Sequence, residues 1–510
     1  MNRLEEAFAE SDLPIRVDLL DWWGVSDSFR AVIEKGFEIL QKGGWDVGSE
    51  WVVTTLGKVV SQGGGFVQTG PFGSQLHASD YVDDGIPCIM PINIVNNAID
   101  LTCVVRITQD DADRLSRHIV KADDIIYSRR GDVTRKALIR KDEAGMFCGT
   151  GCLLVRPGNG IDAQFLFYHL STPQNQEWIV RHAIGATMPN LNTGILSKAP
   201  LRIPEHTLQK AIAHILGSLD DKIELNRQMN ETLESMAQAL FKSWFVDFDP
   251  VIDNALAAGN EIPDALKAKA ATRQALGAAR KTLPDQIRTQ FPSAFEFREE
   301  MGWVPEGWEV RPLNTLIDLI GGGTPKTSNS DCWGGDIPWF SVVDAPEPSD
   351  VFVVETEKHV TKLGVENSST KILRTGTTII SARGTVGKCA IVGYPMAMNQ
   401  SCYGINGIDN ISDIFTYYTI LLRVSDLQLR SHGSVFSTIT RNTFGTIQTP
   451  FGGEKLTVEF EDLVRPFFDS ILEKNIEKIS LKKLRDTLLP KLLSGQLRIP
   501  DAEKLIENAL

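Results

Sequence analysis

The sequence has little of what a secreted, membrane-bound or metal-binding protein needs. Its 510 residues contain no apolar run of about 18 residues, and the N-terminus lacks the basic-then-apolar pattern of a signal peptide. The seven cysteines are an odd number and form no CxxC pair, which favours buried, reduced thiols over disulfides or a zinc site. These absences predict a cytoplasmic protein that does not associate with membranes.

Catalytic signatures are missing as well. The phosphate-loop pattern GxxxxGK[ST] is absent, because Lys326-Thr327 does not have the required spacing from the glycines before it. The sequence contains no amino-methyltransferase motif, no HExxH, no GxSxG and no zinc-deaminase pattern. We therefore expect a chain that is not an enzyme.

An excess of positive charge is also lacking. The formal net charge is −13, which argues against a simple basic DNA-binding protein. However, residues 49–203 carry 15 basic and 15 acidic side chains, and residues 302–452 carry 11 and 14, so their net charges are 0 and −3. Most of the excess acid lies elsewhere, and a DNA contact needs only a local basic face.

The sequence does contain an internal repeat with a period of about 250 residues, and we name its two globular stretches copy 1 (residues 45–203) and copy 2 (residues 301–452). Both are rich in short strand-like runs punctuated by Gly, Asn and Pro, which indicates compact domains dominated by strands and loops. The matched segments are Gly48–Val52 with Gly307–Val310, Gly63–Gly65 with Gly321–Gly323, Gly85–Pro87 with Asp336–Pro338, Ile125–Gly131 with Ile379–Gly384, and Asn192-Thr193 with Asn442-Thr443.

A long amphipathic helix is predicted after each copy, over residues 205–245 and 456–494. Apolar residues recur at gaps of three and four, which gives each helix a single apolar stripe. A helix of about 40 residues is about 60 Å long, and alone it cannot bury such a stripe. We therefore predict that the two helices pack together as a coiled-coil pair; the alternative is that each is a core helix of its own domain.

The predicted fold class is α/β (α+β), with two β-rich domains separated by a pair of long antiparallel helices and related by a pseudo-twofold axis. The predicted boundaries are 1–44 for an N-terminal fragment, 45–203 for the first domain, 204–245 for the first long helix, 246–300 for a connector, 301–452 for the second domain, 453–496 for the second long helix and 497–510 for a tail.

This layout resembles the specificity subunits of type I restriction–modification enzymes over about residues 45–500. Three local signatures carry the resemblance. Thr69–Leu76, followed by Gly85–Pro87, looks like the opening of a target-recognition domain of that family. Gln290–Pro292 with Gly302–Trp308 looks like the entry into the second such domain, and Leu484–Gly495 is similar to the end of the second conserved helix.

The resemblance implies a DNA-reading subunit with a two-part target. Each domain would read one half of a split site in double-stranded DNA, and the helix pair would fix the gap between the halves. A rod of about 60 Å can bridge half-sites about 34 Å apart. The implied partners are two modification (methyltransferase) subunits and restriction subunits, to which S-adenosylmethionine, ATP and magnesium would belong.

Residues 11–40 do not fit this layout and look like the tail of a minimal nucleotidyltransferase. The Gly-Ser and Asp-x-Asp motifs that precede this tail in that family are absent, so Asp18 would be a lone carboxylate. We interpret residues 1–44 as a docking element or a vestigial fragment.

The candidate DNA contacts in copy 1 are a basic run and a polar loop. Arginine can hold phosphates or read guanine, and glutamine suits adenine. The alternatives are a charged, solvated hairpin edge and ordinary turn chemistry. The candidates are Arg129, Arg130, Arg135, Lys136, Arg140, Lys141, Gln68, Thr69, Ser74, Gln75 and His77. The glycines Gly63–Gly65 would let the backbone approach DNA.

The candidates in copy 2 lie at corresponding places, and they are Thr324, Lys326, Arg383, Lys388, Arg441 and Asn442. In the first long helix, the cluster of Phe241, Trp244 and Phe245 has two open interpretations, a methyltransferase-binding surface or part of a core. Two other functions also stay open: a scaffold that binds proteins through the helix pair without reading sequence, and a nucleotidyltransferase-related enzyme.

Overall fold

The computed structural model describes residues 51–185, 189–277, 283–431 and 438–507. The predicted N-terminal fragment, including Asp18, lies outside these residues. Contacts divide the chain into two compact units. Unit 1 contains the described residues up to Ala163, Pro173–Gln209 and Lys491–Ile499. Unit 2 contains Gln164–Thr172, Lys210–Pro490 and the described residues from Pro500 onward.

The two long helices form where the apolar stripes predict them. Helix α8 spans His206–Phe245 and helix α16 spans Glu454–Leu493, 40 residues each. The predicted bounds of 205–245 and 456–494 are thus confirmed to within two residues. The two helices start 248 residues apart, and α16 continues through Pro466 and Pro490 without interruption.

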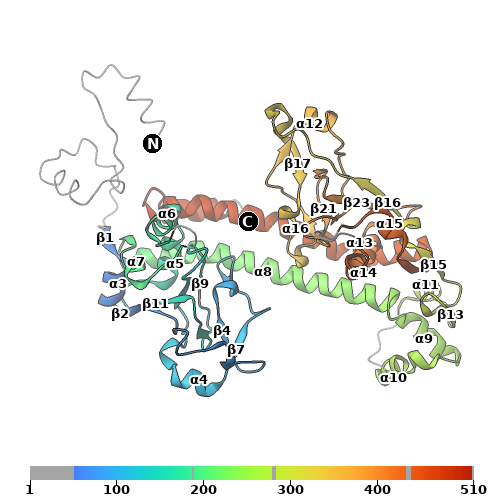
Figure 1. Cartoon of the computed structure of the whole chain (residues 1–510), viewed down its shortest axis with the longest axis horizontal. Helices are drawn as coiled ribbons and strands as arrows, with labels where there is room; N and C mark the ends of the chain where they lie inside the picture. Colours follow the sequence, from blue (N-terminus) through green and yellow to red (C-terminus); the bar gives the residue numbers. More distant parts are fainter. Residues whose placement is uncertain (1–50, 186–188, 278–282, 432–437, 508–510) are drawn as a thin grey trace, which may run out of the picture. The chain divides into compact units, whose positions relative to one another are not determined.

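Within unit 2 the two helices run side by side in opposite directions (Figure 1). Arg485 pairs with Asp220, Asn230 pairs with Asn475, and the ring of Phe241 contacts that of Phe460. As the residue number rises along α8, the number of its partner falls along α16. The predicted antiparallel pair is therefore confirmed.

Copy 1 is built from short strands in two four-stranded sheets and two small pairs. One sheet has the order β10-β4-β7-β3 and the other β2-β11-β8-β9; β1 pairs with β12, and β5 with β6. The strands are β1 (Val52–Thr55), β2 (Gly64–Thr69), β3 (Tyr81–Val82), β4 (Ile86–Ile89), β5 (Ile94–Val95), β6 (Ala98–Ile99), β7 (Val105–Ile107), β8 (Ile125–Ser128), β9 (Lys136–Leu138), β10 (Phe147–Cys148), β11 (Cys152–Gly158) and β12 (Pro200–Ile203). The helices are α3 (Leu56–Gln62), α4 (Gln109–Arg114), α5 (Ala163–Leu170), α6 (Pro173–His182) and α7 (Thr193–Leu196).

Copy 2 has a five-stranded sheet of order β16-β23-β20-β21-β18 and a three-stranded sheet of order β19-β17-β22. The strands are β15 (Glu309–Pro312), β16 (Ile317–Gly321), β17 (Trp333–Phe340), β18 (Phe352–Val353), β19 (His359–Val360), β20 (Thr378–Ser381), β21 (Cys389–Val392), β22 (Ala397–Met398), β23 (Cys402–Gly407) and β24 (Gln448–Phe451), with β24 paired to β15. The helices are α12 (Lys362–Glu366), α13 (Asp413–Leu422), α14 (Val424–Leu429) and α15 (Arg441–Gly445).

The repeat seen in the sequence is a repeat of strand order. Strands β2-β11-β8-β9 of copy 1 correspond to β16-β23-β20-β21 of copy 2, and the outer pair β1-β12 corresponds to β15-β24. Equivalent backbone hydrogen bonds support this correspondence. In copy 1 Leu56 N donates to the Ala199 carbonyl oxygen, and in copy 2 Leu313 N donates to the Ile447 carbonyl oxygen.

Two of the matched segments are out of register in the structure. Gly70, not Gly63–Gly65, corresponds to Gly322, because Thr69 pairs with Leu153 as Gly321 pairs with Tyr403. At the end of each copy, Asn192 caps α7 and Thr440 caps α15, so Asn192 does not correspond to Asn442.

The connector between α8 and copy 2 is a small helical element with a hairpin. Its described elements are α9 (Asp249–Ala258), α10 (Lys267–Ala275), α11 (Asp285–Arg288), β13 (Phe295–Arg298) and β14 (Gly302–Pro305). The Asn254 side chain donates to the carbonyl of Phe291 and so ties α9 to the end of the connector. Among the described residues, no helix combines the length and the apolar content that a bilayer crossing needs.

The aromatic cluster at the end of α8 belongs to a core. Phe241, Trp244 and Phe245 are buried, and all three rings contact Phe460 of α16. Phe245 also contacts Phe415 of α13, so copy 2 is seated on the helix pair through this cluster. The interpretation of these three side chains as a methyltransferase-binding surface is therefore wrong, and the core interpretation is correct.

Candidate nucleic-acid interface

In each copy, the ends of three neighbouring strands form one edge of the sheet, which we name the strand-end edge. In copy 1 it consists of Thr69-Gly70, Arg129–Gly131, Gly149–Gly151 and Asn190. In copy 2 it consists of Gly321–Thr324, Ala382–Gly384, Asn399–Ser401, Thr438 and Arg441. The first three segments of each copy follow or precede the paired strands β2, β8 and β11, or β16, β20 and β23. Asn190 and Thr438 join them through β-bridges to Arg130 and Arg383, and Arg441 lies against the ring of Tyr403.

Matching backbone hydrogen bonds hold the two edges in the same shape. In copy 1, Arg129 N donates to the Gly151 carbonyl oxygen at 2.8 Å and the Arg129 carbonyl accepts from Leu191 N at 2.8 Å. In copy 2, Ala382 N donates to the Ser401 carbonyl oxygen at 2.7 Å and the Ala382 carbonyl accepts from Ile439 N at 2.9 Å. The next residue in each case is an exposed arginine, Arg130 or Arg383.

Glycine is required at two points of each edge. Gly131 and Gly384 follow the exposed arginines with φ angles of 75° and 74°, where a side chain would strain the backbone. Gly70 and Gly322 lie against the carbonyl oxygens of Gly149 and Asn399, and a Cβ atom at either position would collide with that oxygen. Gly70 and Gly322 thus allow neighbouring strand ends to approach each other closely. Gly131 and Gly384 allow the backbone to turn directly after the exposed arginines Arg130 and Arg383.

The basic run of copy 1 does not form one face. Arg129 is half-buried, with its Nε 3.4 Å from Asn190 Oδ1, and Arg130 is exposed beside it. Arg135 is exposed in the following turn, where it pairs with Asp132 at 3.4 Å. Arg129 and Arg130 thus belong to the strand-end edge, and Arg135 lies in the adjoining turn between β8 and β9.

Lys136 is not available to DNA in this structure. Its side chain is 1% exposed, and its Nζ lies 5.9 Å from the centre of the Tyr127 ring. Burial lowers the pKa of the Lys136 ammonium to about 8, although the negative charge of Asp132 acts in the opposite direction and raises it. The prediction that Lys136 contacts DNA is therefore wrong in this structure, because Lys136 and its neighbour Ala137 on β9 are both buried.

Arg140 and Lys141 are exposed, but they lie at the other end of the strands. They follow β9, which runs antiparallel to β8, whereas Arg129 and Arg130 follow β8. Since β8 and β9 form a hairpin, the two basic pairs are at opposite ends of it. Gly63–Gly65 are likewise at the start of β2, beside Gly158, and Thr69 is at its end.

The polar candidates of copy 1 fall into two groups. Gln68 is half-buried, and its Nε2 donates to the Arg117 carbonyl oxygen at 2.6 Å, so this amide already has a protein partner. Ser74, Gln75 and His77 are exposed in the loop after β2. Gln75 Oε1 accepts from Phe72 N at 3.1 Å, which orders the loop, and Thr69 is at the strand-end edge itself.

The candidates of copy 2 gather more closely. Thr324 donates a hydrogen bond to Gln400 Oε1, and Lys326 is exposed two residues further on. Arg441 starts α15, with its guanidinium 5.9 Å from the centre of the Tyr403 ring. Asn442 is the next exposed residue. Arg383 and Lys388 flank the turn between β20 and β21, both exposed, as the repeat predicted.

Sequence reasoning missed two residues of the edges, Asn190 and Gln400. Asn190 forms a β-bridge with Arg130, and Gln400 is opposite Arg383 in the extension of the β20–β23 pairing. Both are remote from the arginines along the chain, and no local motif marks them. An exposed glutamine beside an arginine is a pair that can read adenine and guanine edges.

No group of three His, Cys, Asp or Glu side chains in the described ranges is arranged to hold a metal ion. The seven cysteines are free, and Cys103 is exposed, contrary to the expectation of buried thiols throughout.

Comparison with known proteins identifies a family. Residues 49–235 and 305–451 match the family described as type I restriction modification DNA specificity domain. The chain is 30% identical over 429 residues to the type I restriction enzyme HindI specificity subunit of Haemophilus influenzae, covering 79% of this chain and 93% of that subunit. The S subunit of a type I restriction-modification system from M. genitalium shares the fold, with a TM-score of 0.51, 15% identity and coverage of 88% and 97%.

A much shorter match is of a different kind. Over 41 residues, 8% of the chain, the sequence is 56% identical to the probable protein adenylyltransferase MntA of Haemophilus influenzae. Those 41 residues span only 36% of that protein. A match of this extent is similarity to a fragment and carries no activity to this chain.

Proposed function

Because the chain belongs to the family of type I restriction–modification DNA specificity subunits, we propose that its two strand-end edges each read one half of a split DNA target. The chain supplies sequence specificity to a restriction–modification system and is not its catalytic subunit. S-adenosylmethionine, ATP and magnesium are assigned by this proposal to the partner subunits.

The observation that carries the proposal is the duplicated edge. Two sheets of the same strand order present an exposed arginine from the same hydrogen-bonded turn, Arg130 in copy 1 and Arg383 in copy 2. The neighbouring side chains differ, Asn190 and Thr150 in one case and Thr438 and Gln400 in the other. The same frame with different side chains is what reading two different half-sites requires.

The edges suit DNA chemically despite the acidic net charge. An arginine on a strand end can bind a phosphate or donate two hydrogen bonds to guanine O6 and N7. Amide side chains beside it can add further contacts to bases. Binding then depends on the few phosphates neutralised locally and not on the total charge of −13.

The helix pair supplies a spacer between the two readers. Each helix of 40 residues is about 60 Å long at about 1.5 Å per residue. Half-sites read from one side of B-DNA are separated by about 34 Å for each turn of the duplex. A stiff antiparallel pair of this length is therefore sufficient to fix the distance between two such half-sites.

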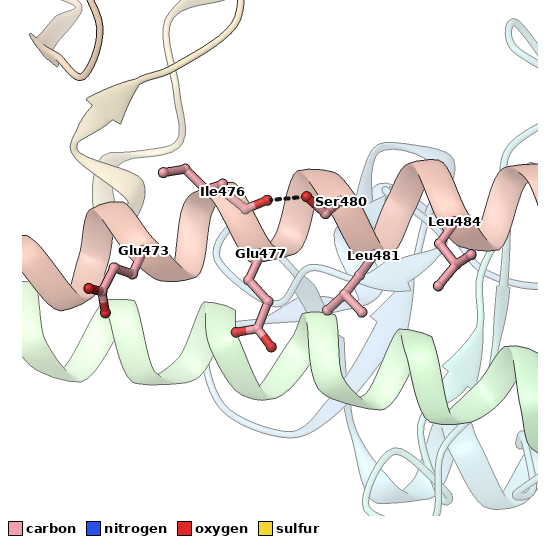
Figure 2. A pocket seen from close by; sticks show the side chains of 6 residues that line it. All are labelled: Glu473, Ile476, Glu477, Ser480, Leu481 and Leu484. Carbon is pink, nitrogen blue, oxygen red and sulfur yellow. Dashed lines mark hydrogen bonds between the residues drawn. The ribbon is translucent and has the colours of Figure 1, made fainter. Parts of the chain in front are cut away.

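The helix pair also offers two equivalent hollows for a partner. One is on α16 and is lined by Glu473, Ile476, Glu477, Ser480, Leu481 and Leu484 (Figure 2). The other is on α8 and is lined by Gln228, Glu231, Thr232, Ser235, Met236 and Ala239. The offset of 248 residues that relates the helices maps Gln228, Thr232 and Met236 onto Ile476, Ser480 and Leu484.

Equivalent hollows on an antiparallel pair suit two copies of one partner. We assign them to the two methyltransferase subunits, one on each helix, because each half-site needs its own modification. Met236 is 48% exposed in its hollow. Met236→Asp and Leu484→Asp should each remove one methyltransferase subunit from the assembled complex, as measured by its mass, whereas Leu429→Asp on the exposed side of α14 should remove none.

Block replacement tests the reading function. Residues 302–452 are exchanged for the corresponding block of another family member, and the methylated motif of the host DNA is sequenced. One half of the motif should change and the other should stay. A change in both halves would refute modular reading, and a change in neither would leave a scaffold without sequence readout.

A charge test locates the edge in copy 1. Arg129→Ala with Arg130→Ala should weaken DNA binding by the assembled complex and flatten its dependence on salt, because fewer counterions are released. Arg140→Ala with Lys141→Ala removes the same charge at the opposite end of the hairpin and serves as the matched control. Equal losses in the two double variants would argue against the edge as the DNA contact.

A further inference from the structure

Buried asparagines lie in the middle of the helix pair. Asn230 of α8 is 0% exposed and Asn475 of α16 is 3% exposed, and Asn230 Nδ2 donates to Asn475 Oδ1 at 2.8 Å. Apolar residues fill the pair toward its ends, for example Leu219 and Phe460. Burying two amides is unfavourable compared with burying two leucines, so their presence calls for a role other than stability.

A corner of copy 2 reaches into this polar layer. The backbone carbonyl oxygen of Asp350 accepts a hydrogen bond from Asn475 Nδ2 at 2.6 Å. The side-chain carboxylate of Asp350 accepts one from Asn230 Nδ2 at 3.3 Å. Lys478 of α16, which is buried, pairs with the same carboxylate. One residue of copy 2 thus contacts both helices at once, and we name Asn230, Asn475, Lys478 and Asp350 the polar lock.

The backbone at this corner is held in an unfavourable shape. Val351, which follows Asp350, has a φ of 56° and is buried. A β-branched residue rarely adopts positive φ, and such strain persists only where the surroundings fix it. The strained backbone at Val351 is therefore part of what holds Asp350 in contact with both helices.

We propose that the polar lock determines which spacer length the protein accepts between the two half-sites, by fixing the register of α8 against α16 and the seat of copy 2. This inference rests on the proposed function, because a spacer exists only if the target is split. A buried asparagine in a helix pair is known to specify register at a cost in stability.

The lock discriminates against slipped registers. Sliding one helix by seven residues would bring Asn230 opposite Lys482 or Phe468 in place of Asn475. The buried amides would lose their partners, and Asp350 would lose its contact with one helix or the other. The slip is about 10.5 Å at about 1.5 Å per residue, or about three base pairs at about 3.4 Å.

The experiment measures spacer choice by the assembled methyltransferase. Duplexes carry the two half-sites of the native motif with spacers from three base pairs shorter to three longer than the native one, and methylation rates are compared. In the double variant Asn230→Leu with Asn475→Leu, the preference for the native spacer over those three base pairs away should fall by about tenfold or more. The half-site sequences should stay the same.

Two further variants separate register from folding. Asp350→Ala shortens a half-buried side chain without placing new bulk between the helices, and it should broaden spacer choice to a smaller extent. Asn254→Leu removes a buried asparagine of the connector, and its spacer profile should match the wild type. A merely structural role for the lock would lower all methylation rates by the same factor and leave the ratio unchanged.

The outcomes distinguish this inference from the proposed function. Suppose that the wild-type complex prefers one spacer and that both the Asn230→Leu/Asn475→Leu variant and the Asp350→Ala variant keep this preference. The polar lock then does not determine the spacer length, but the proposal that the two copies read a split target still holds. If the wild-type complex methylates every spacer equally, or needs only one half-site, the proposed function fails and the inference falls with it.

Discussion

At three equivalent positions the contacts of copy 1 involve charged groups, whereas those of copy 2 involve neutral groups. In copy 1, Asp124 is 1% exposed and forms a two-pronged ion pair with Arg156, with Nε 2.8 Å and Nη2 2.5 Å from the carboxylate oxygens. The equivalent residues of copy 2 are Thr377 and Asn406, whose hydroxyl and amide oxygens are 2.9 Å apart. The same cross-strand contact is charged in one copy and neutral in the other.

The second position is on the hairpin next to the strand-end edge. Lys136 pairs with Tyr127 across the strands in copy 1, and Cys389 pairs with Ile380 in copy 2. Copy 1 therefore has an ammonium group in its interior where copy 2 has a small thiol.

The third position is a tyrosine that contacts the helix pair within unit 2. Tyr168 of α5 donates to Asp220 at 2.6 Å, and Arg485 holds the other oxygen of that carboxylate at 2.6 Å. Its equivalent, Tyr418 of α13, is surrounded by the rings of Phe241, Phe460 and Phe468. One tyrosine sits on an ion pair and the other in an aromatic cluster.

The difference shows that the repeat preserves shape and register but not polarity. Strand order and backbone hydrogen bonds match between the copies, whereas side-chain pairs change together, since Asp with Arg becomes Thr with Asn. A buried charge must keep its partner, so copy 1 should respond more strongly than copy 2 to loss of one member of a pair.

The largest effect is expected from breaking the Asp124–Arg156 pair. Arg156→Met should lower the local stability of copy 1 by about 3–5 kcal/mol, because the buried Asp124 carboxylate loses its positive partner and keeps only the hydrogen bond from Lys121 N. Hydrogen exchange of the β8 and β11 amides in the full chain measures this loss. Thr377→Val in copy 2 should lower stability by only about 1 kcal/mol.

Exchange of the whole pair sharpens this comparison. Asp124→Thr with Arg156→Asn copies the neutral pair of copy 2 into copy 1 and should recover most of the stability lost in Arg156→Met. A double variant as unstable as the single one would mean that buried charge is not what distinguishes the copies.

An intermediate effect is expected at the two tyrosines that contact the helix pair. Tyr168→Phe loses a hydrogen bond to a carboxylate and should cost about 1.5–3 kcal/mol. Tyr418→Phe removes a hydroxyl whose contact with the Glu234 carbonyl oxygen is 3.4 Å long, and it should cost less than about 1 kcal/mol. Protection of α5 and α13 amides against exchange reports both values, and equal losses would contradict the difference between the two contacts.

The smallest effect is a gain, and it depends on pH. Since the folded pKa of Lys136 is about 8 and the unfolded value about 10.5, the unfolded chain binds more protons between these limits. The cost of burying the ammonium is therefore complete below pH 8 and disappears as the pH rises through 10.5. Lys136→Met should raise the free energy of unfolding by about 1–2 kcal/mol at pH 7 and by little at pH 10.5.

The same variant separates stability from recognition. DNA affinity of the assembled complex should be unchanged in Lys136→Met, because the side chain is buried. A loss of affinity comparable to that of Arg129→Ala with Arg130→Ala would mean that Lys136 turns outward on DNA.

The long helices were predictable from sequence and the short motifs were not. The stripes of α8 and α16 extend over 40 residues each, so their bounds are fixed by many positions. The glycine and Asn-Thr matches rest on two or three residues and slip easily, which is why Gly63–Gly65 and Asn442 were matched wrongly. Strand pairing, which single motifs do not encode, sets the true register.

The candidate site was predictable only in part for a similar reason. Arg130 and Arg383 were found because each follows an apolar strand and precedes a glycine. Asn190 and Gln400 join them only through pairing of segments far apart in the chain. The burial of Lys136 depends on the sheet behind β9, which a run of basic letters does not reveal.

The most direct measurement is strand-resolved sequencing of methylated adenines in DNA from cells in which this chain is the specificity subunit. Two readers on a fixed helix pair predict one motif with two defined parts, one methylated adenine in each, and an undefined spacer of constant length. A continuous motif, or two parts whose spacing varies from site to site, would contradict the account.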